Sequence, residues 1–383
     1  MSPRKFLTWI ELSEDALNWN LNSLSRLAGK SLLTACVKGN AYGHGLPEIT
    51  GMINKRRDVA YLTVHSIDEA AACRSNGWKR KIMLLGPAPL DDVEGIIEYD
   101  LEPVVSNAEF LTRLGKLGLK HKRKIATHIK LETGTNRQGV SDKELPRFAK
   151  IYARYDSLPR PLGASMHFAN IEDTTNHEYA QFQLDNFKRL VGRMEQLGIK
   201  PKLRHTASSA ALILFDKTHF DLVRPGIGVY GHWPSKETYL SYRLLGGKNS
   251  IFRPVLSWKT RVTQIKELAA GSFIGYGCTY RTTAKTRLAI LPIGYADGYD
   301  RDLSNRGHVL IRGKRAPVRG RICMNLMMVD VTHIRGVKLE DEVTLIGKDR
   351  DEVITAEQLA EWAGTINYEI LARIGSSIAR VKS

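Results

Sequence analysis

The first part of the chain alternates short apolar runs with longer amphipathic stretches. After a short strand at residues 9–11, a helix is expected to begin after Ser13, and leucines from Leu17 to Leu27 mark one face of it. Eight further apolar runs are expected to be strands: residues 32–37, 60–64, 81–85, 102–105, 125–131, 162–167, 202–206 and 222–224. Strands that alternate with helices build parallel sheets, and eight such repeats are typical of a (β/α)8 barrel, whose active site lies at the carboxyl ends of its strands.

The pattern changes in the second part of the chain. Residues 232–253 interrupt the alternation and are expected to form a linker. After them, β-type runs at residues 255–262, 287–293, 308–312 and 328–332 are separated by Gly, Asp and Asn, which is typical of antiparallel sheets, and residues 355–363 are expected to be the one clear helix. We therefore predict an α/β fold class. A (β/α)8 TIM-like barrel would cover residues 9–240, and a mainly antiparallel β domain would cover residues 241–383 and pack with residues 1–8.

Length and composition are those of a globular protein with room for both domains. The chain has 383 residues, of which 43% are hydrophobic and 25% charged, and no apolar run approaches the roughly 20 residues of a membrane span. The N-terminus lacks the apolar core of a signal peptide, so we expect a cytoplasmic protein. The four cysteines have no Cys-x-x-Cys spacing, which predicts neither a metal site nor a disulfide framework.

The formal net charge of +17 raises the question of nucleic-acid binding. The basic runs at residues 54–57 and 120–124 are short and contain no interleaved aromatic rings, so a solvated surface explains them better. We therefore predict neither a nucleic-acid nor a membrane partner. The charge can instead attract a cofactor phosphate or a substrate carboxylate.

Lys38 stands where the first barrel strand is expected to end, and several glycines and a tyrosine follow it. A lysine at that place loses part of its water shell, which favours the neutral amine of a Schiff-base nucleophile, although spacing alone favours a lysine that extends into solvent. The segment VKGNAYGHG at residues 37–45 resembles the pyridoxal-phosphate (PLP) lysine motif of the bacterial alanine racemases. Further motifs follow in that family's order along essentially the whole chain.

The resemblance implies PLP as cofactor and an isomerase that interconverts L-alanine and D-alanine. Lys38 would form the PLP aldimine and take the proton of the D-enantiomer. Tyr276, in GYGCTY at residues 275–280, would take the proton of the L-enantiomer. An aromatic residue between glycines is more often a turn or packing residue, so the assignment of this second base depends on the resemblance.

The resemblance also implies residues that bind the cofactor and the substrate. Arg224 would donate to the pyridine nitrogen of PLP with His167 behind it. Lys130 would be the lysine that many members carbamylate to orient a neighbouring arginine, here Arg137. The implied cofactor-binding residues are Lys38, Tyr42, His167, Ser209, Arg224, Gly226, Ile227 and Tyr368, and the implied substrate-binding residues are Arg137, Tyr295 and Met324.

In this family Tyr276 and Met324 act on the barrel of the partner subunit, which implies a homodimer with shared active sites. The expected product, D-alanine, would supply the peptidoglycan of the bacterial cell wall.

Two positions depart from the family pattern. Asn325 stands where many members have aspartate, and Ser208 where asparagine is frequent. They leave open a broad-specificity racemase that also acts on serine or lysine. A PLP-dependent decarboxylase of similar architecture is a rival class, but it lacks Tyr-Gly-His-Gly after its lysine. A non-catalytic PLP-binding protein is another rival class, but it resembles the barrel only.

Overall fold

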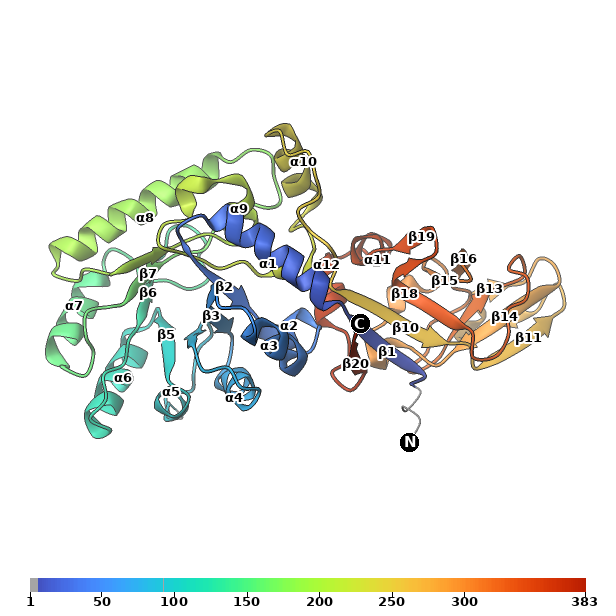
Figure 1. The fold of residues 1–383 in the computed structure, drawn as a ribbon, viewed down its shortest axis with the longest axis horizontal. Coiled ribbons are helices and arrows are strands. Elements are labelled where there is room, and N and C mark those ends of the chain that lie inside the picture. Colours follow the sequence, from blue (N-terminus) through green and yellow to red (C-terminus); the bar gives the residue numbers. More distant parts are fainter. Residues whose placement is uncertain (1–5, 92) are drawn as a thin grey trace. The chain divides into compact units, whose positions relative to one another are not determined.

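The computed structural model describes residues 6–91 and 93–383, which divide into two compact units (Figure 1). The barrel unit contains residues 18–38 and 49–253. The β unit contains the described residues up to Leu17 together with residues 39–48 and 254–383. The segment that follows Lys38 therefore belongs by its contacts to the β unit, although its neighbours in sequence belong to the barrel.

The barrel unit is built on one eight-stranded sheet of order β8-β7-β6-β5-β4-β3-β2-β9, in which every neighbouring pair is parallel. The strands are β2 (Leu32–Cys36), β3 (Val59–Val64), β4 (Lys81–Leu84), β5 (Leu101–Val105), β6 (His128–Lys130), β7 (Gly163–Ser165), β8 (Leu203–His205) and β9 (Leu222–Val223). Backbone bonds from Asp221 N–H to the Arg204 carbonyl (3.0 Å) and from Arg224 N–H to the Ala207 carbonyl (2.9 Å) join its two end strands. The predicted barrel fold is confirmed.

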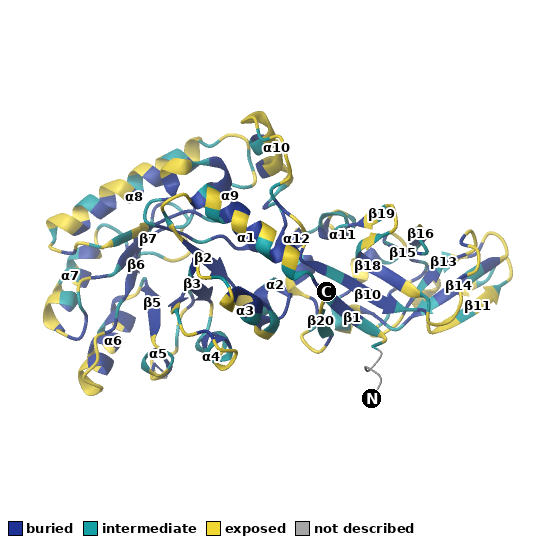
Figure 2. Ribbon diagram, in the orientation of Figure 1, coloured by how far each residue is buried: buried dark blue, intermediate teal, exposed yellow. Residues whose placement is uncertain are grey.

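Helices cover the outside of this sheet (Figure 2). They are α1 (Glu14–Ala28), α3 (Leu46–Asn54), α4 (Ile67–Ser75), α5 (Gly95–Glu98), α6 (Ala108–Lys120), α7 (Leu145–Arg154), α8 (Glu178–Gln196) and α9 (Ser209–Leu214). Figure 2 shows that α6 and α8 turn exposed residues away from the buried strands. Helix α6 is representative: the Asn107 side chain accepts from the N–H groups of Glu109 and Phe110, and Leu111 and Leu114 are fully buried one turn apart.

The β unit contains two main sheets. The larger has the order β16-β15-β18-β10-β1-β20, with β19 beside β18, and the smaller has the order β11-β14-β17. Their strands are β1 (Thr8–Leu12), β10 (Leu256–Arg261), β11 (Gln264–Leu268), β14 (Thr286–Leu291), β15 (His308–Ile311), β16 (Lys314–Pro317), β17 (Met327–Asp330), β18 (Glu342–Asp349), β19 (Glu352–Ile354) and β20 (Ala379–Lys382), and a small hairpin pairs β12 (Phe273–Ile274) with β13 (Tyr280–Arg281). All pairs are antiparallel except β1 with β20, so the predicted mainly antiparallel domain is confirmed.

The N-terminal strand belongs to the larger sheet of the β unit. Strand β1 pairs with β10, and the hydroxyl of Thr8 lies 2.9 Å from that of Thr260. Of the residues 1–8 that were expected to pack here, residues 1–5 lie outside the described part of the chain.

Two local predictions were wrong. Residues 232–253, expected to be a linker, contain helix α10 (Lys236–Leu244), whose first turn is capped by Ser235. This segment stays with the barrel unit, because the side chain of Asn20 bonds both backbone groups of Arg253 at 2.8 Å. The helix at residues 355–363 was expected to be the one clear helix of the β domain. It is present as α11 (Ala356–Ala363), but a second helix, α12 (Asn367–Ala372), follows it and is too short to show a helical period in the sequence.

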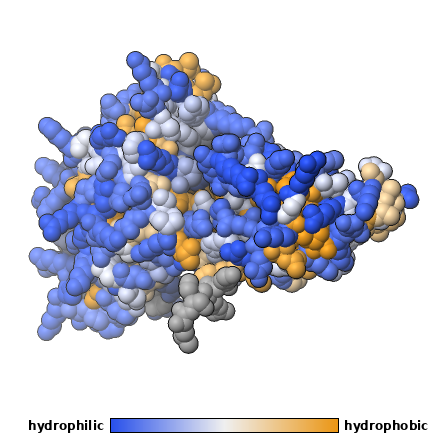
Figure 3. Space-filling model, turned by 45° about the vertical axis from the view of Figure 1, so that its right-hand side comes forward, coloured by the Kyte–Doolittle hydropathy of each residue, from blue (hydrophilic) through white to orange (hydrophobic). Residues whose placement is uncertain are grey.

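Hydrophilic residues cover most of the face drawn in Figure 3, with apolar patches between them. Within the described residues, no helix combines the length and the apolar character that a membrane crossing requires.

Candidate active site

Lys38 lies directly after β2, at the carboxyl ends of the barrel strands, and a strained turn follows it. Gly39, Asn40, Ala41 and Tyr42 all have left-handed backbone conformations, with φ between 53° and 63°. A left-handed conformation costs a non-glycine residue about 1–2 kcal/mol, so three in succession must be stabilised by surrounding contacts. Such strain concentrates at functional sites. Lys38 itself is exposed, so the chain does not supply the loss of water that its position after a buried strand led us to expect.

Hydrogen bonds and a close backbone approach hold this turn. The Asn40 carbonyl accepts from Gly45 N–H at 3.0 Å, and its side-chain oxygen accepts from Leu46 N–H at 2.8 Å. The Gly43 carbonyl accepts from Arg380 Nη2 at 2.8 Å, within the β unit. The turn places the ring of Tyr42 6.1 Å, between centroids, from the ring of Tyr368 in α12. The structure therefore brings together these two predicted cofactor-binding residues.

Arg224 follows β9 and is held by the residues around it. Its Nη1 donates to the His205 carbonyl at 2.7 Å and to His205 Nδ1 at 2.5 Å, and its Nη2 donates to the Met166 carbonyl at 2.8 Å. Burial lowers the pKa of Arg224 to about 10, which leaves it a cation at neutral pH. The histidine that hydrogen-bonds this arginine is His205, which lies within the strand predicted at residues 202–206, whereas His167 was the histidine expected behind it.

The pKa of His167 is affected by several cations. Burial, followed by the positive charges of Arg224, Arg137, Lys130 and Lys38, lowers the pKa of His167 to about 3. The imidazole is therefore neutral at physiological pH. Because one side chain is acted on by all four cations, they converge on the same end of the barrel.

Lys130 ends β6 among these charges. Burial, the charges of Arg137 and Arg224, and a smaller contribution from Lys38 lower the pKa of Lys130 to about 8. Its Nζ lies 3.4 Å from Oε1 of Gln138. An amine with this pKa is partly neutral near physiological pH, which is the form that reacts with electrophiles.

Ser209, Gly226 and Ile227 meet at the ends of β8 and β9. The hydroxyl oxygen of Ser209, the first residue of α9, accepts from Gly226 N–H at 2.9 Å and from Gly228 N–H at 3.2 Å. Gly226 precedes the 3₁₀ turn η2 (Ile227–Tyr230). Since the oxygen of Ser209 already accepts from two N–H groups, its proton is oriented away from them and can be donated to an anion.

Three predicted residues are exposed together on the β unit. Tyr276 is 72% exposed, Met324 57% and Tyr295 43%. The turns that carry them are joined by bonds from Tyr295 N–H to the Cys323 carbonyl (3.1 Å) and from Ala296 N–H to the Met324 carbonyl (2.9 Å). A β-carbon at Gly277 would lie 2.7 Å from Arg321 Nη1, so the Tyr276 turn packs against the same loop.

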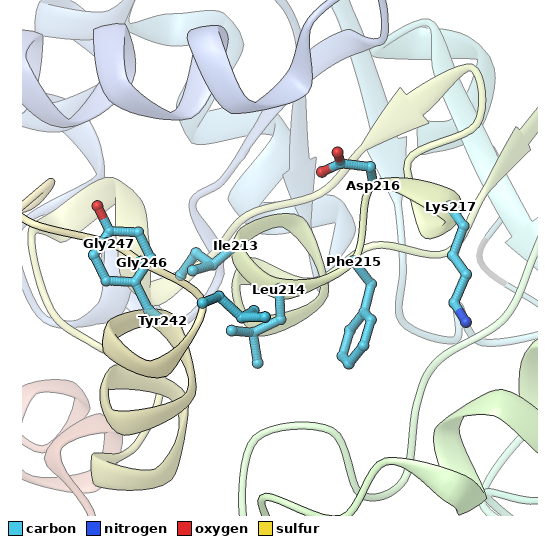
Figure 4. A pocket seen from close by; sticks show the side chains of 9 residues that line it. Ile213, Leu214, Phe215, Asp216, Lys217, Tyr242, Gly246 and Gly247 are labelled. Carbon is cyan, nitrogen blue, oxygen red and sulfur yellow. The ribbon is translucent and has the colours of Figure 1, made fainter.

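Two of the hollows on the barrel unit differ in their relation to the predicted site. One, of about 640 Å³, is lined by residues 213–217 together with Tyr242 and residues 245–247 (Figure 4). None of these lining residues belongs to the predicted site. The other, of about 180 Å³, is lined by the segments that follow β4 and β5 and by Lys130 and Gln138. The smaller hollow, at the carboxyl ends of the strands, is therefore the one that belongs to the predicted site.

Comparison with known proteins matches both parts of the chain to domains of one family. The family described as "Alanine racemase, N-terminal domain" matches residues 12–234, and "Alanine racemase, C-terminal domain" matches residues 255–382. An alanine racemase of Leptospira interrogans serovar Lai is 38% identical over 382 residues, covering 98% of this chain and 96% of that protein. One of Halothermothrix orenii is 37% identical over 374 residues, covering 97% and 96%.

Solved structures of the same family are also similar to this chain. The alanine racemase of Bacillus anthracis with bound L-Ala-P has a TM-score of 0.90 and 33% identity, covering 100% of this chain and 96% of that one. The enzyme of Bartonella henselae, with covalently bound pyridoxal phosphate, has a TM-score of 0.85 and 27% identity, covering 99% of this chain and 100% of that one.

Proposed function

This chain belongs to the alanine racemase family, and from that premise we propose that it interconverts L-alanine and D-alanine with pyridoxal 5'-phosphate as its cofactor. The observation that carries the proposal is the neutral His167 surrounded by the charges of Lys38, Lys130, Arg137 and Arg224, with Lys38 at the end of a barrel strand. The family match extends over the β unit, which argues against a non-catalytic protein that shares only the barrel.

The side chains present fit this cofactor. An amine, a fixed guanidinium and a hydroxyl with a donatable proton are the groups that an aldehyde, a pyridine nitrogen and a phosphate require. Lys38 would hold the cofactor covalently, Arg224 would donate to its ring nitrogen, and Ser209 with the Gly226 and Ile227 backbone would bind its phosphate together with Tyr42 and Tyr368. When bound, PLP supplies an electron sink that makes the α-hydrogen of an amino acid removable.

Two side chains would then move the proton. From D-alanine, Nζ of Lys38 would take the proton and the phenol of Tyr276 would deliver one to the opposite face. From L-alanine, the phenol oxygen of Tyr276 would take the proton and the Lys38 ammonium would deliver one. A phenol is a weak base at neutral pH, so Tyr276 needs a cationic neighbourhood that stabilises its phenolate. The cluster around His167 has that charge.

The substrate carboxylate would be held by Arg137, with the backbone of Met324 and the ring of Tyr295 beside it. Carbamylation of Lys130 would convert a cation into an anion next to Arg137 and so orient that arginine. The lowered pKa of Lys130, about 8, supports this because carbon dioxide reacts only with the neutral amine.

The exposure of Tyr276 and Met324 supports a homodimer in which each β unit completes the site of the partner's barrel. A phenol that is 72% exposed in the single chain lacks the enclosed environment that proton transfer requires. We further propose a cytoplasmic enzyme that supplies D-alanine for peptidoglycan.

The test is an absorbance spectrum of the purified protein, followed by chiral analysis after incubation with L-alanine, L-serine and L-lysine in separate reactions. We expect a borohydride-reducible cofactor band and D-alanine as the main product. A band without racemisation would instead support a binding protein. Preferred turnover of serine or lysine would indicate that Asn325 and Ser208 have widened the specificity.

A further inference from the structure

Four polar side chains, three of them buried, form a line across the inside of the barrel. Arg224 Nη1 lies 2.5 Å from Nδ1 of His205, Nε2 of His205 lies 2.9 Å from Nδ1 of His128, and Nε2 of His128 lies 3.3 Å from Oε2 of Glu102. Both histidines are 0% exposed and Glu102 is 3% exposed. The line begins after β9, crosses β8 and β6, and ends on β5.

The chemistry of its two ends fixes the position of every proton along the line. A guanidinium has only donors, so Nδ1 of His205 must accept and its proton must sit on Nε2. That N–H can only donate to Nδ1 of His128, whose own proton must then sit on Nε2 and point at Glu102. An ionised carboxylate has only acceptors, so the opposite end imposes the same direction.

Further contacts keep Glu102 ionised. Burial acts to raise the pKa of Glu102, but the hydrogen bond from His128 and the nearby charge of Lys81 act against burial, and the pKa lies below its ordinary value. Lys81 Nζ lies 3.1 Å from Oε1. Burial, together with the charge of Glu102 and a hydrogen bond to it, raises the pKa of Tyr61. At the other end, burial and the charge of Arg224 hold the pKa of His205 well below its ordinary value, so His205 stays neutral.

We propose that Glu102 and His128 are positioning residues for Arg224, to which the carboxylate is linked through two imidazoles of fixed tautomer. The relay holds Nδ1 of His205 as an acceptor and so fixes the guanidinium at the place where it would meet the cofactor ring. This consequence for the cofactor rests on the proposed function, whereas the direction of the relay does not. Without the carboxylate only the Arg224 end sets the direction. The reversed line, in which a His205 Nδ1–H faces an Arg224 N–H, then loses only that one bond and becomes more populated.

The first test reads the protons directly. In the purified protein with selectively ¹⁵N-labelled histidine, we expect His128 and His205 to be neutral and protonated on Nε2 across neutral pH. An imidazolium at either residue, or a proton on Nδ1, would overturn the relay. This measurement needs no variant and no enzymatic activity, so it separates failure of the relay from failure of the proposed racemase.

The second test removes the negative charge of Glu102 and keeps the size and shape of the side chain nearly constant. In Glu102→Gln the amide can donate as well as accept, so we expect a second tautomer to appear at His205. We also expect a shifted absorbance band of the bound cofactor, and a kcat about tenfold lower in both directions with a KM changed less than about twofold. Unchanged histidine spectra in a folded Glu102→Gln would contradict the proposal.

A matched control is Lys81→Met, which removes the half-exposed partner on the other carboxylate oxygen and leaves the line intact. Because the bond from His128 to the carboxylate remains, the histidine tautomers and the kcat of this variant are expected to change much less than those of Glu102→Gln. If Lys81→Met shifted them as much as Glu102→Gln does, general loosening of the barrel rather than the relay would be the cause.

Discussion

A β-carbon at Gly43 would lie 1.8 Å from the carbonyl oxygen of Leu371, so the turn that follows Lys38 and helix α12 touch backbone to backbone. Gly43 also has a φ of 81°, a conformation that side chains disfavour. The contact holds Tyr42 near Tyr368, and it fixes a turn whose neighbouring residues are strained.

We predict that Gly43→Ala lowers the free energy of unfolding by about 2–4 kcal/mol, because the new methyl group must displace the Leu371 backbone as well as adopt a positive φ. Chemical denaturation measures the change. Gly51→Ala in helix α3 is the control: no atom lies within 4 Å of its β-carbon position, and alanine favours a helix, so stability should stay equal or rise. Equal effects of the two variants would contradict the role of the Leu371 contact.

Lys38→Ala and Tyr276→Phe should fail in different ways. Removal of the amine should abolish the borohydride-reducible band. Loss of the phenol should keep that band but slow proton removal from L-alanine by at least about 100-fold, since general bases contribute that much. Deuterium exchange at the α-carbon, measured separately from each enantiomer, tests this. Unimpaired exchange from both enantiomers in Tyr276→Phe would refute the two-base assignment.

Mixed dimers test whether the sites are shared. If Tyr276 of one subunit serves Lys38 of the other, a heterodimer of Lys38→Ala and Tyr276→Phe contains one site with both changes and one with neither. Random assembly should then restore about one quarter of wild-type activity, because half of the dimers are mixed and each has one intact site. Mixing Lys38→Ala with Lys38→Met should restore none. Absence of rescue in the first mixture would place both groups in one subunit.

Lys130 should form a carbamate that depends on pH. Its pKa of about 8 means that the neutral amine becomes more abundant as pH rises through that value. With ¹³C-labelled carbon dioxide at constant pressure, the carbamate signal should therefore grow between about pH 7 and about pH 9. Lys130→Arg should remove the signal, and a signal that persists in that variant would come from another amine.

Much of the fold and part of the site could be predicted from local pattern. The barrel strands are predictable because a strand such as β3 is a short apolar run between polar boundaries, and Lys38 could be placed at a strand end for the same reason. The cap of α10 at Ser235 is also a local signal. However, leucines of this helix are exposed, and the segment was predicted to be a linker.

Contacts between residues far apart in the chain were determined only by the tertiary structure. His205 becomes the partner of Arg224, and His128 the partner of His205, only because barrel closure brings β6, β8 and β9 together. The left-handed turn after Lys38 likewise depends on Leu371, more than 300 residues away. Apolar periodicity reports which side of an element is buried, because burial acts residue by residue. It carries no information on the direction of a hydrogen bond or on a backbone strained by a distant neighbour, since those are properties of pairs.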